Sequence, residues 1–438
     1  MNNRGLFMKT GWLGWVVFTG SLIVVFIMGV VITSVMERRA ETRLLPQAIV
    51  PIPEGETDPA LWGKNFPREY DRFLLTADTT GRTKYGGSYP FSHLERDTLL
   101  AYLWAGYPFA IEYNEDRGHQ WALLDVRKTG RRDPGKGGKP GTGACMTCKT
   151  ADAPGLMEEI GVAGFYATPF AEVDARVRHS IGCSDCHDPK TMALVITRPA
   201  LREALVSMGK NPDSLSHQEM RSLVCAQCHS EYFMATGSYL TFPWKYGLSP
   251  EAMERFYDEA GFADWVHADS KARMIKMQHP DYEMFTTGIH AFSGLACPDC
   301  HMPYMAEGGV KFTDHYIQSP LNNIGNTCVR CHEWDEDETR ARVETIQDNN
   351  QQLLQRAELA LVAAHREIVM ASGAGATDEQ LARARALVRS AQLRWDYVSA
   401  NNGMGFHSPQ EAARILATSI DLAHQARESA MQCAKKEK

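Results

Sequence analysis

The sequence predicts a mainly α-helical fold that ends in long helices. Runs in which Val, Ile and Thr alternate with polar residues, as they do in strands, are scarce among the 438 residues. From Asp335 onward Gly and Pro become rare, and apolar residues recur at the three-and-four spacing of a helix. These apolar positions are Val343, Ile346, Leu353, Ala357, Leu361, Ala364 and Ile368.

The C-terminal region, residues 335–438, is expected to hold three helices. The first should end near Gly373-Ala374-Gly375. A second should begin at Thr377, with Gln380 completing a capping box, and run to about Ala400. A third should begin at Ser408-Pro409. Such helices can cover the rest of the protein as a layer, or they can pack against a second copy, and we expect a homodimer interface here.

Five C-x-x-C motifs lie between residues 145 and 332, and four of them continue with His. C-x-x-C-H is the attachment motif of c-type haem, in which the two cysteines bind the porphyrin and the His ligates iron. The motifs use ten of the eleven cysteines and leave Cys433. The four His motifs are Cys183, Cys186 and His187; Cys225, Cys228 and His229; Cys297, Cys300 and His301; and Cys328, Cys331 and His332. We therefore expect a multihaem cytochrome c fold, with helices and loops wrapped around five haems over residues 68–334.

The remaining motif, Cys145-Met146-Thr147-Cys148-Lys149, ends in Lys. A Lys amine can ligate iron only after losing its proton, which it normally holds to a pKa near 10.4. The alternative is that Lys149 is an ordinary surface residue and that the iron is ligated from elsewhere. If Lys149 is the ligand, one haem differs chemically from the other four.

The N-terminal residues 1–36 contain an uncharged segment, and its core from Trp12 to Val35 is long enough to cross a hydrocarbon layer of about 30 Å as a helix. Signal-peptide cores are shorter, about 7–15 residues, and end in a small-x-small cleavage site, so we favour an uncleaved anchor over a removed signal. Because c-type cytochromes are matured outside the cytoplasmic membrane, the domain should face the periplasm, whether anchored or released. Residues 37–67 are expected to form a Pro-rich, extended tether.

The chain has a formal net charge of −7 and a pI near 6.1, which argues against a nucleic-acid-binding protein. It also has fifteen His, of which four belong to the motifs. Low-spin haems need a sixth ligand, usually a second His. Four more His would complete four haems and leave the Lys149 haem with an open position for a substrate.

The motif set and several local strings resemble cytochrome c nitrite reductase, the pentahaem enzyme that reduces nitrite to ammonium. The resemblance covers roughly residues 68–430. The strings are Arg117-Gly118-His119, Cys228-His229-Ser230-Glu231-Tyr232, Lys276-Met277-Gln278-His279-Pro280, Thr287-Gly288-Ile289-His290 and Thr313-Asp314-His315. The N-terminal span departs from most of this family, in which a cleaved signal is expected.

The resemblance implies the sixth ligand of each His-ligated haem. Numbering the haems in chain order, it pairs His315 with His187 on the second, His119 with His229 on the third, His407 with His301 on the fourth and His290 with His332 on the fifth. His407 rests on the weakest local match, Gly405-Phe406-His407-Ser408-Pro409. The resemblance gives no ligand role to His93, His179, His217, His267, His365 or His424.

The resemblance also implies the residues around the open iron. Arg131, Tyr232 and His279 would face nitrite as donors, although Arg132 is adjacent and remains an alternative to Arg131. A calcium ion would be held by the side chains of Glu231 and Gln278 and by the backbone carbonyls of Tyr232 and Lys276, which suits a hard cation.

The expected function is therefore a six-electron reduction of nitrite to ammonium at the Lys149 haem, with electrons relayed through four bis-His haems. The expected donor is a quinol-oxidising membrane multihaem cytochrome or a soluble redox protein. Two alternatives stay open: a multihaem electron carrier without a substrate, and a reductase of hydroxylamine or sulfite.

Overall fold

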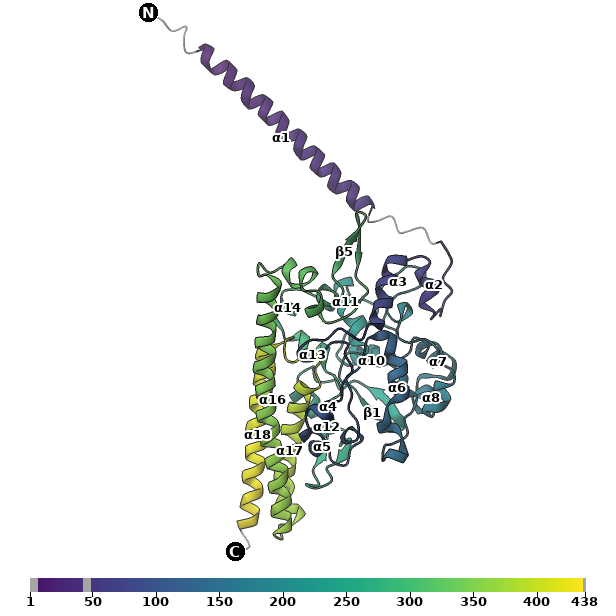
Figure 1. Ribbon diagram of the computed structural model, residues 1–438, viewed down its shortest axis with the longest axis vertical. Coiled ribbons are helices and arrows are strands. Elements are labelled where there is room, and N and C mark those ends of the chain that lie inside the picture. Colours follow the sequence, from purple (N-terminus) through teal and green to yellow (C-terminus); the bar gives the residue numbers. More distant parts are fainter. Residues whose placement is uncertain (1–6, 42–48, 436–438) are drawn as a thin grey trace, which may run out of the picture. The chain divides into compact units, whose positions relative to one another are not determined.

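The computed structural model describes residues 7–41 and 49–435. The chain divides into two units, Met1–Pro51 and Ile52–Lys438, which are described separately here (Figure 1). The first unit contains a single long helix within its described residues, α1 (Phe7–Glu41). Its segment Trp12–Met36 has a mean hydropathy of 2.6, and none of it is buried. By length and composition, α1 suits a membrane-crossing helix or a signal sequence.

The second unit is built of short helices, turns and loops, followed by three long helices (Figure 1). This agrees with the mainly α-helical fold predicted from the sequence. The short helices are α2 (Pro59–Gly63), α3 (Pro67–Leu74), α4 (His93–Arg96), α5 (Leu99–Leu103), α6 (Ala122–Lys128), α7 (Ala153–Ile160), α8 (Val162–Ala167), α9 (Phe170–Asp174), α10 (Pro199–Ser207), α11 (His217–Ala226), α12 (Pro250–Glu259), α13 (Asp281–Thr286), α14 (Ile289–Phe292) and α15 (Cys297–His301).

Strands contribute little. Three antiparallel two-stranded sheets occur among the described residues, and none has strands longer than four residues. The pairs are β1 (Phe233–Ala235) with β2 (Tyr239–Thr241), β3 (Trp265–Val266) with β4 (Arg273–Met274), and β5 (Tyr304–Glu307) with β6 (Val310–Thr313).

The three C-terminal helices form as predicted. They are α16 (Glu336–Gly373), α17 (Asp378–Ser399) and α18 (Pro409–Lys435). Asp335 caps α16, and Thr377 and Gln380 form the expected capping box on α17. The three helices pack side by side and form one side of the second unit (Figure 1). Trp395 of α17 lies 6.1 Å from Trp104, ring centroid to ring centroid, and so joins this layer to the loops before it.

The extended tether predicted over residues 37–67 is wrong at residues 37–41, which continue helix α1, and at residues 59–63, which form helix α2. Asp58 caps this helix and Pro59 occupies its first turn, where a missing N–H costs nothing. Trp62 is buried, so this part of the tether is packed rather than loose. Residues 42–48 of the tether lie outside the described residues.

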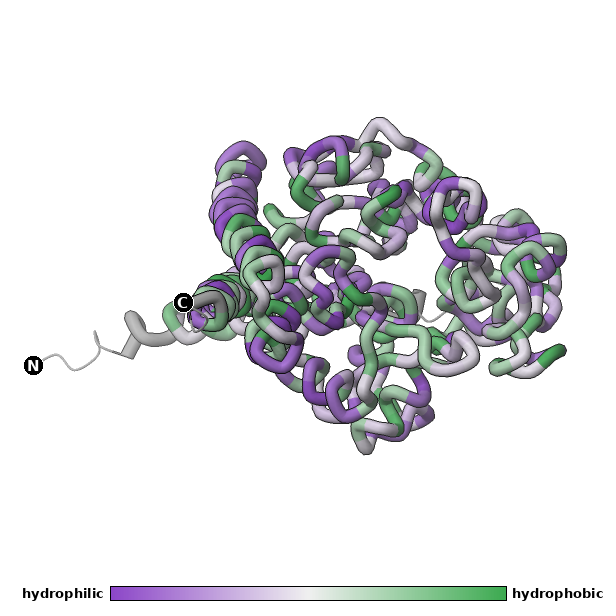
Figure 2. Tube along the Cα trace, turned by 90° about the horizontal axis from the view of Figure 1, so that it is seen from below, coloured by the Kyte–Doolittle hydropathy of each residue, from purple (hydrophilic) through white to green (hydrophobic). Residues whose placement is uncertain are grey.

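The apolar interior of the second unit is distributed rather than layered. One buried cluster runs from α5 and α6 through α10 and α12 to the long helices. Figure 2 shows apolar and polar residues interspersed along the loops of this unit. The loops therefore carry few long apolar runs, as expected of a chain in which cofactors supply part of the interior.

Candidate haem pockets and active site

Each C-x-x-C motif lies on a helical turn. They fall on the 3₁₀ turns at residues Gly143–Met146, Cys183–Asp185 and Cys328–Arg330, at the end of α11, and on α15. In three His motifs the backbone N–H of His187, His229 or His332 donates to the carbonyl of the first cysteine of its own motif. The Lys motif differs, because the Lys149 N–H donates to Met146 instead, at 3.0 Å.

The structure brings together the four His pairs that the resemblance implies. The ring centroids are 6.3 Å apart in the pairs of the second, third and fifth haems and 6.4 Å apart in that of the fourth. A metal–imidazole bond is ~2.0 Å long and a ring nitrogen lies ~1.1 Å from its centroid, so the centroids of two rings on one iron are about 6.2 Å apart. The spacing fits an iron ion between each pair.

A fifth His pair shows that this spacing is not general. The rings of His267 and His365 stack only 4.2 Å apart, too close for an iron between them. Both rings already have protein partners: His267 Nε2 bonds to the Tyr102 carbonyl, and His365 bonds to Ser270 and Gln392. These two His are a satisfied part of the core.

Backbone carbonyls orient several of the paired imidazoles. Nδ1 of His187 lies 3.0 Å from the Met192 oxygen, that of His301 3.0 Å from the Gln318 oxygen, and that of His315 2.8 Å from the Thr313 oxygen. A ring whose Nδ1–H is bonded presents an unprotonated Nε2 to a metal. Burial lowers the pKa of His119 and of His301 to about 4, so the neutral form that binds iron predominates.

Two glycines allow the close approach that places distal His residues. A Cβ on Gly288 would overlap the carbonyl oxygen of His407, and a Cβ on Gly118 would overlap that of Thr76. Gly288 lies two residues before His290, and Gly118 directly precedes His119. Glycine is required at both positions because any side chain would push these backbones apart.

The Lys149 amine lies among charged and polar groups, and it interacts electrostatically with Asp116, Arg131 and His279. Its Nζ lies 3.0 Å from Oδ2 of Asp116, and this carboxylate raises the pKa of the amine. Iron must therefore displace a proton held by this pair. Tyr232 and His279 pack edge to face with centroids 5.9 Å apart, and burial raises the pKa of Tyr232 and lowers that of His279 to about 4.

The two candidate arginines point to different surroundings. Arg131 stacks over Phe109, with the guanidinium carbon 4.2 Å from the ring centroid, and its positive charge acts on Tyr232 and Asp116. Arg132 stacks over Phe170 at 3.7 Å. Arg131 is thus the arginine whose charge acts on Tyr232, whereas Arg132 interacts with Cys145.

The residues implied for calcium lie together; Glu231 and Lys276 are buried, and Tyr232 and Gln278 are half-buried. Glu231 Oε2 accepts the N–H of Gln278 at 2.6 Å, and its Oε1 accepts the Tyr257 hydroxyl at 2.8 Å. The Gln278 amide lies 3.1 Å from the Lys276 carbonyl oxygen. Burial raises the pKa of Glu231 well above its usual range, so a cation would strongly favour its ionised form. This set of oxygens fits calcium.

A further carboxylate stands behind these residues. Glu283 Oε1 accepts the backbone N–H of Glu231 at 2.9 Å and the Trp244 indole N–H at 2.7 Å. Its other oxygen is buried without a hydrogen-bond partner, and burial raises its pKa to about 8. Glu283 holds the Glu231-Tyr232 turn in place.

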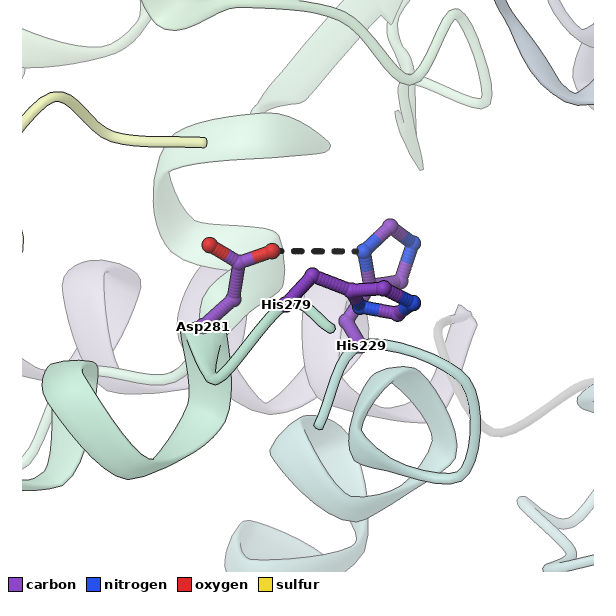
Figure 3. Close-up of side chains that lie close together, drawn as sticks. All are labelled: His229, His279 and Asp281. Carbon is purple, nitrogen blue, oxygen red and sulfur yellow. Dashed lines mark ion pairs between the residues drawn. The ribbon is translucent and has the colours of Figure 1, made fainter. Parts of the chain in front are cut away.

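His229, His279 and Asp281 lie together at the N-terminal end of α13, with one ligand atom of each lying within 4.8 Å of the others (Figure 3). Nδ1 of His229 is 3.7 Å from Oδ2 of Asp281. Asn402 donates its backbone N–H and its amide N–H to Asp281, both at 2.8 Å. A carboxylate behind an imidazole orients the ring and raises its basicity, so Asp281 belongs to the surroundings of His229.

Sequence reasoning missed Asp116, Asp281, Glu283 and Asn402. None belongs to a C-x-x-C motif, although Asp116 is three residues from His119 and Asp281 two residues from His279. For Asp116 and Asp281, the short distance in sequence to His119 and His279 was the only feature that could have indicated a role in the site.

The fold and these pockets define a multihaem c-type cytochrome. The chain belongs to the cytochrome c552 family, which it matches over residues 58–438. It is 47% identical over 421 residues to cytochrome c-552 of Bacteroides fragilis, covering 95% of this chain and 85% of that one. It is 40% identical over 428 residues to cytochrome c-552 of Maridesulfovibrio salexigens, covering 94% and 83%.

A solved structure is similar over most of the chain. It is the catalytic subunit of cytochrome c nitrite reductase from Desulfovibrio desulfuricans, a protein described with two calcium sites. The TM-score is 0.81 and the identity 34%, with 88% of each chain covered.

Proposed function

We propose that this chain is an ammonia-forming nitrite reductase. The balanced reaction consumes one nitrite, six electrons and eight protons and gives one ammonium and two waters. The observation that carries the proposal is an asymmetry. Four motif His each face a second His at 6.3–6.4 Å, whereas the Lys149 amine faces Asp116 and interacts electrostatically with Arg131 and His279. One haem would then be free to bind a substrate.

The haem attached at Cys145 and Cys148, with Lys149 on its iron, would bind nitrite through nitrogen and deliver the electrons. The surrounding side chains supply charge and protons. Arg131 offers a fixed positive charge to the entering anion and to the negative charge that grows on oxygen as each N–O bond breaks. The Tyr232 hydroxyl and the His279 ring N–H can donate hydrogen bonds or protons to the substrate. After giving up a proton, the His279 imidazole can be reprotonated from solvent.

The remaining four haems would serve as the electron relay. The proposed axial pairs are His187 with His315, His119 with His229, His301 with His407 and His290 with His332. Two His on each iron leave no position for a substrate, which suits electron transfer.

We also propose calcium beside the pocket, on Glu231, Gln278 and the carbonyls of Tyr232 and Lys276. Its support is the buried Glu231 carboxylate, whose pKa burial raises although the Lys276 charge lowers it, and the polar Gln278–Lys276 contact. The ion would fix the two turns that carry Tyr232 and His279.

The proposal extends to the surroundings of the enzyme. We propose that α1 anchors the protein so that the haem unit faces the periplasm, and that α16, α17 and α18 form the homodimer interface. Electrons would come from a quinol-oxidising membrane multihaem cytochrome or from a soluble redox protein.

The decisive experiment is to reduce the purified, fully haem-loaded protein with an artificial donor, add nitrite and measure ammonium. We expect one ammonium for each six electrons consumed. A matched Lys149→His variant should lose most of its nitrite turnover, and the spectrum of its high-spin haem should differ from that of the parent. Absence of ammonium from the loaded parent would instead identify an electron carrier.

Hydroxylamine and sulfite should be tested as substrates in the same assay. Faster turnover of either, with no ammonium from nitrite, would move the assignment to that class of reductase.

A further inference from the structure

We infer that Asp116 is a positioning residue for the Lys149 amine and that it tunes the reduction potential of the haem that Lys149 ligates. This inference rests on the proposed function only in taking Lys149 as an iron ligand. Asp116 would accept an N–H hydrogen bond from the iron-bound amine, fix the direction of Nζ and increase its electron donation.

The contact itself is direct. Lys149 Nζ and Asp116 Oδ2 are 3.0 Å apart, which is hydrogen-bond distance. Among the described residues, the Lys149 amine is the hydrogen-bond partner found for this carboxylate.

A lysine ligand needs such a partner more than a histidine does. The imidazole ring is planar, and the backbone carbonyls of Met192, Gln318 and Thr313 already orient three of the paired rings. The lysine amine stands on a flexible four-carbon stem. A neutral amine bound to iron keeps two hydrogens, so one can donate to Asp116 while the lone pair binds the metal. Asp116 would thus orient the Lys149 amine, as the backbone carbonyls orient the imidazole rings.

The Asp116 backbone is held firmly enough to act this way. Arg117, the next residue, forms an ion pair with Asp125 of α6 and stacks over Trp121 at 3.8 Å. Gly118 presses against Thr76. The same stretch continues to His119, which faces His229. One short segment therefore orients the Lys149 amine and a ligand of the neighbouring third haem.

A charge-assisted bond to a carboxylate strengthens electron donation by a ligand, and loss of such a partner typically changes metal affinity or activity by about 10–100-fold. Weaker donation disfavours ferric iron. Replacing Asp116 should therefore raise the midpoint potential of the Lys149 haem and leave the other four unchanged.

The test uses the full, five-haem protein and a potentiometric titration followed by EPR of the high-spin haem. In Asp116→Asn we expect the ferric-to-ferrous ratio at a fixed potential to fall by about tenfold, equal to a rise of ~59 mV for a one-electron couple. Glu115→Gln is the matched control, because the adjacent Glu115 carboxylate is bound to His93 at 2.9 Å. Its potential should match the parent.

A double-variant cycle separates the hydrogen bond from the bare charge. In a Lys149→His background no amine is present, so adding Asp116→Asn should shift the potential far less than it does in the parent. An equal shift in both backgrounds would reduce Asp116 to a distant charge and overturn the inference.

Two other results would also overturn it. One is an unchanged potential and EPR signal in both Asp116→Asn and Asp116→Ala. The other is a raised KM for nitrite with the potential unmoved, which would place Asp116 on the substrate side. The potential is measured without nitrite, so the two tests are independent. Failure of the parent to form ammonium would reject the proposed function, whereas this inference is decided by the potential alone.

Discussion

Lys276 and Asp396 form a buried ion pair, with Nζ 3.0 Å from Oδ1, that joins the turn before His279 to helix α17. Asp396 Oδ2 also accepts the backbone N–H of Met277 at 3.0 Å, and Asp264 accepts that of Lys276 at 2.8 Å. The long helices therefore hold the backbone that carries a proposed catalytic donor. This bond gives the C-terminal region a part in the active site as well as in the fold.

Asp396→Asn should destabilise the protein strongly. Removing one partner of a buried pair leaves the other charge uncompensated, at a cost of about 3–5 kcal/mol. The free energy of unfolding should be measured by guanidinium titration of the haem-loaded protein. The control is Glu54→Gln, which removes an ion pair to Lys190. The side chains of Glu54 and Lys190 are 82% and 68% exposed, so the variant should lose less than about 1 kcal/mol of unfolding free energy. Equal losses in the two variants would contradict the role given to Asp396.

Glu358 of α16 should make stability depend on pH. Burial, together with the hydrogen bond and charge of the neighbouring Asp97, raises the pKa of Glu358 to about 8. The folded state then binds a proton that the unfolded chain has lost above about pH 4.5, so this contribution to stability is present at acid pH and disappears as pH rises through about 8.

Glu358→Gln should remove this slope. The variant should match the parent at pH 5 and exceed its free energy of unfolding by about 3–4 kcal/mol at pH 8. Denaturant titrations at pH 5, 6.5 and 8 check it. A parent whose stability is flat across this range would show that Glu358 ionises normally.

His407→Ala should convert one low-spin haem to high spin. His407 faces His301 at a centroid distance of 6.4 Å, and it is the proposed ligand with the weakest sequence support. EPR of the oxidised protein should show a second high-spin signal, and electron delivery to the first haem should slow. His424→Ala, at an exposed position on α18, is the control and should leave the spectrum of the parent. A wholly unchanged spectrum for His407→Ala would exclude this pairing.

Removal of calcium should lower turnover without releasing haem. Glu231→Gln weakens the oxygen site, so the turns carrying Tyr232 and His279 should lose their fixed spacing, with a fall of about 10–100-fold in nitrite turnover. Metal analysis should show less calcium in this variant than in the Glu158→Gln control, which changes an exposed carboxylate of α7. Full calcium content in Glu231→Gln would refute the assignment.

Deletion of residues 1–36 in favour of a cleavable signal should release the protein from membranes and leave ammonium formation unchanged. Intact mass of the parent is the companion measurement, because an anchored chain keeps α1 whereas a processed one loses it. A parent found soluble with α1 missing would show that the helix is a signal sequence.

The sequence predicted those parts of the fold that depend on local rules. The capping residues Asp335 and Thr377 mark where α16 and α17 begin, since caps and helical periodicity act within a few residues. The sequence did not predict helix α2. The prolines around it favour an extended chain, but burial of Trp62 stabilises the helix instead. Local strings likewise named Tyr232 and His279. Local strings could not identify Asp116 or Asp281. The roles of these two residues depend on Lys149 and His229, which lie near them only in the folded chain.

Gly288 has a consequence for how the electron relay can change. Its backbone lies against that of His407, and His290 follows two residues later, so one point of contact sets proposed ligands of both the fourth and the fifth haem. A substitution there would disturb two redox centres together. The proposed fourth and fifth haems would therefore change together through this contact, and separate adjustment of their potentials would have to come from elsewhere in the chain.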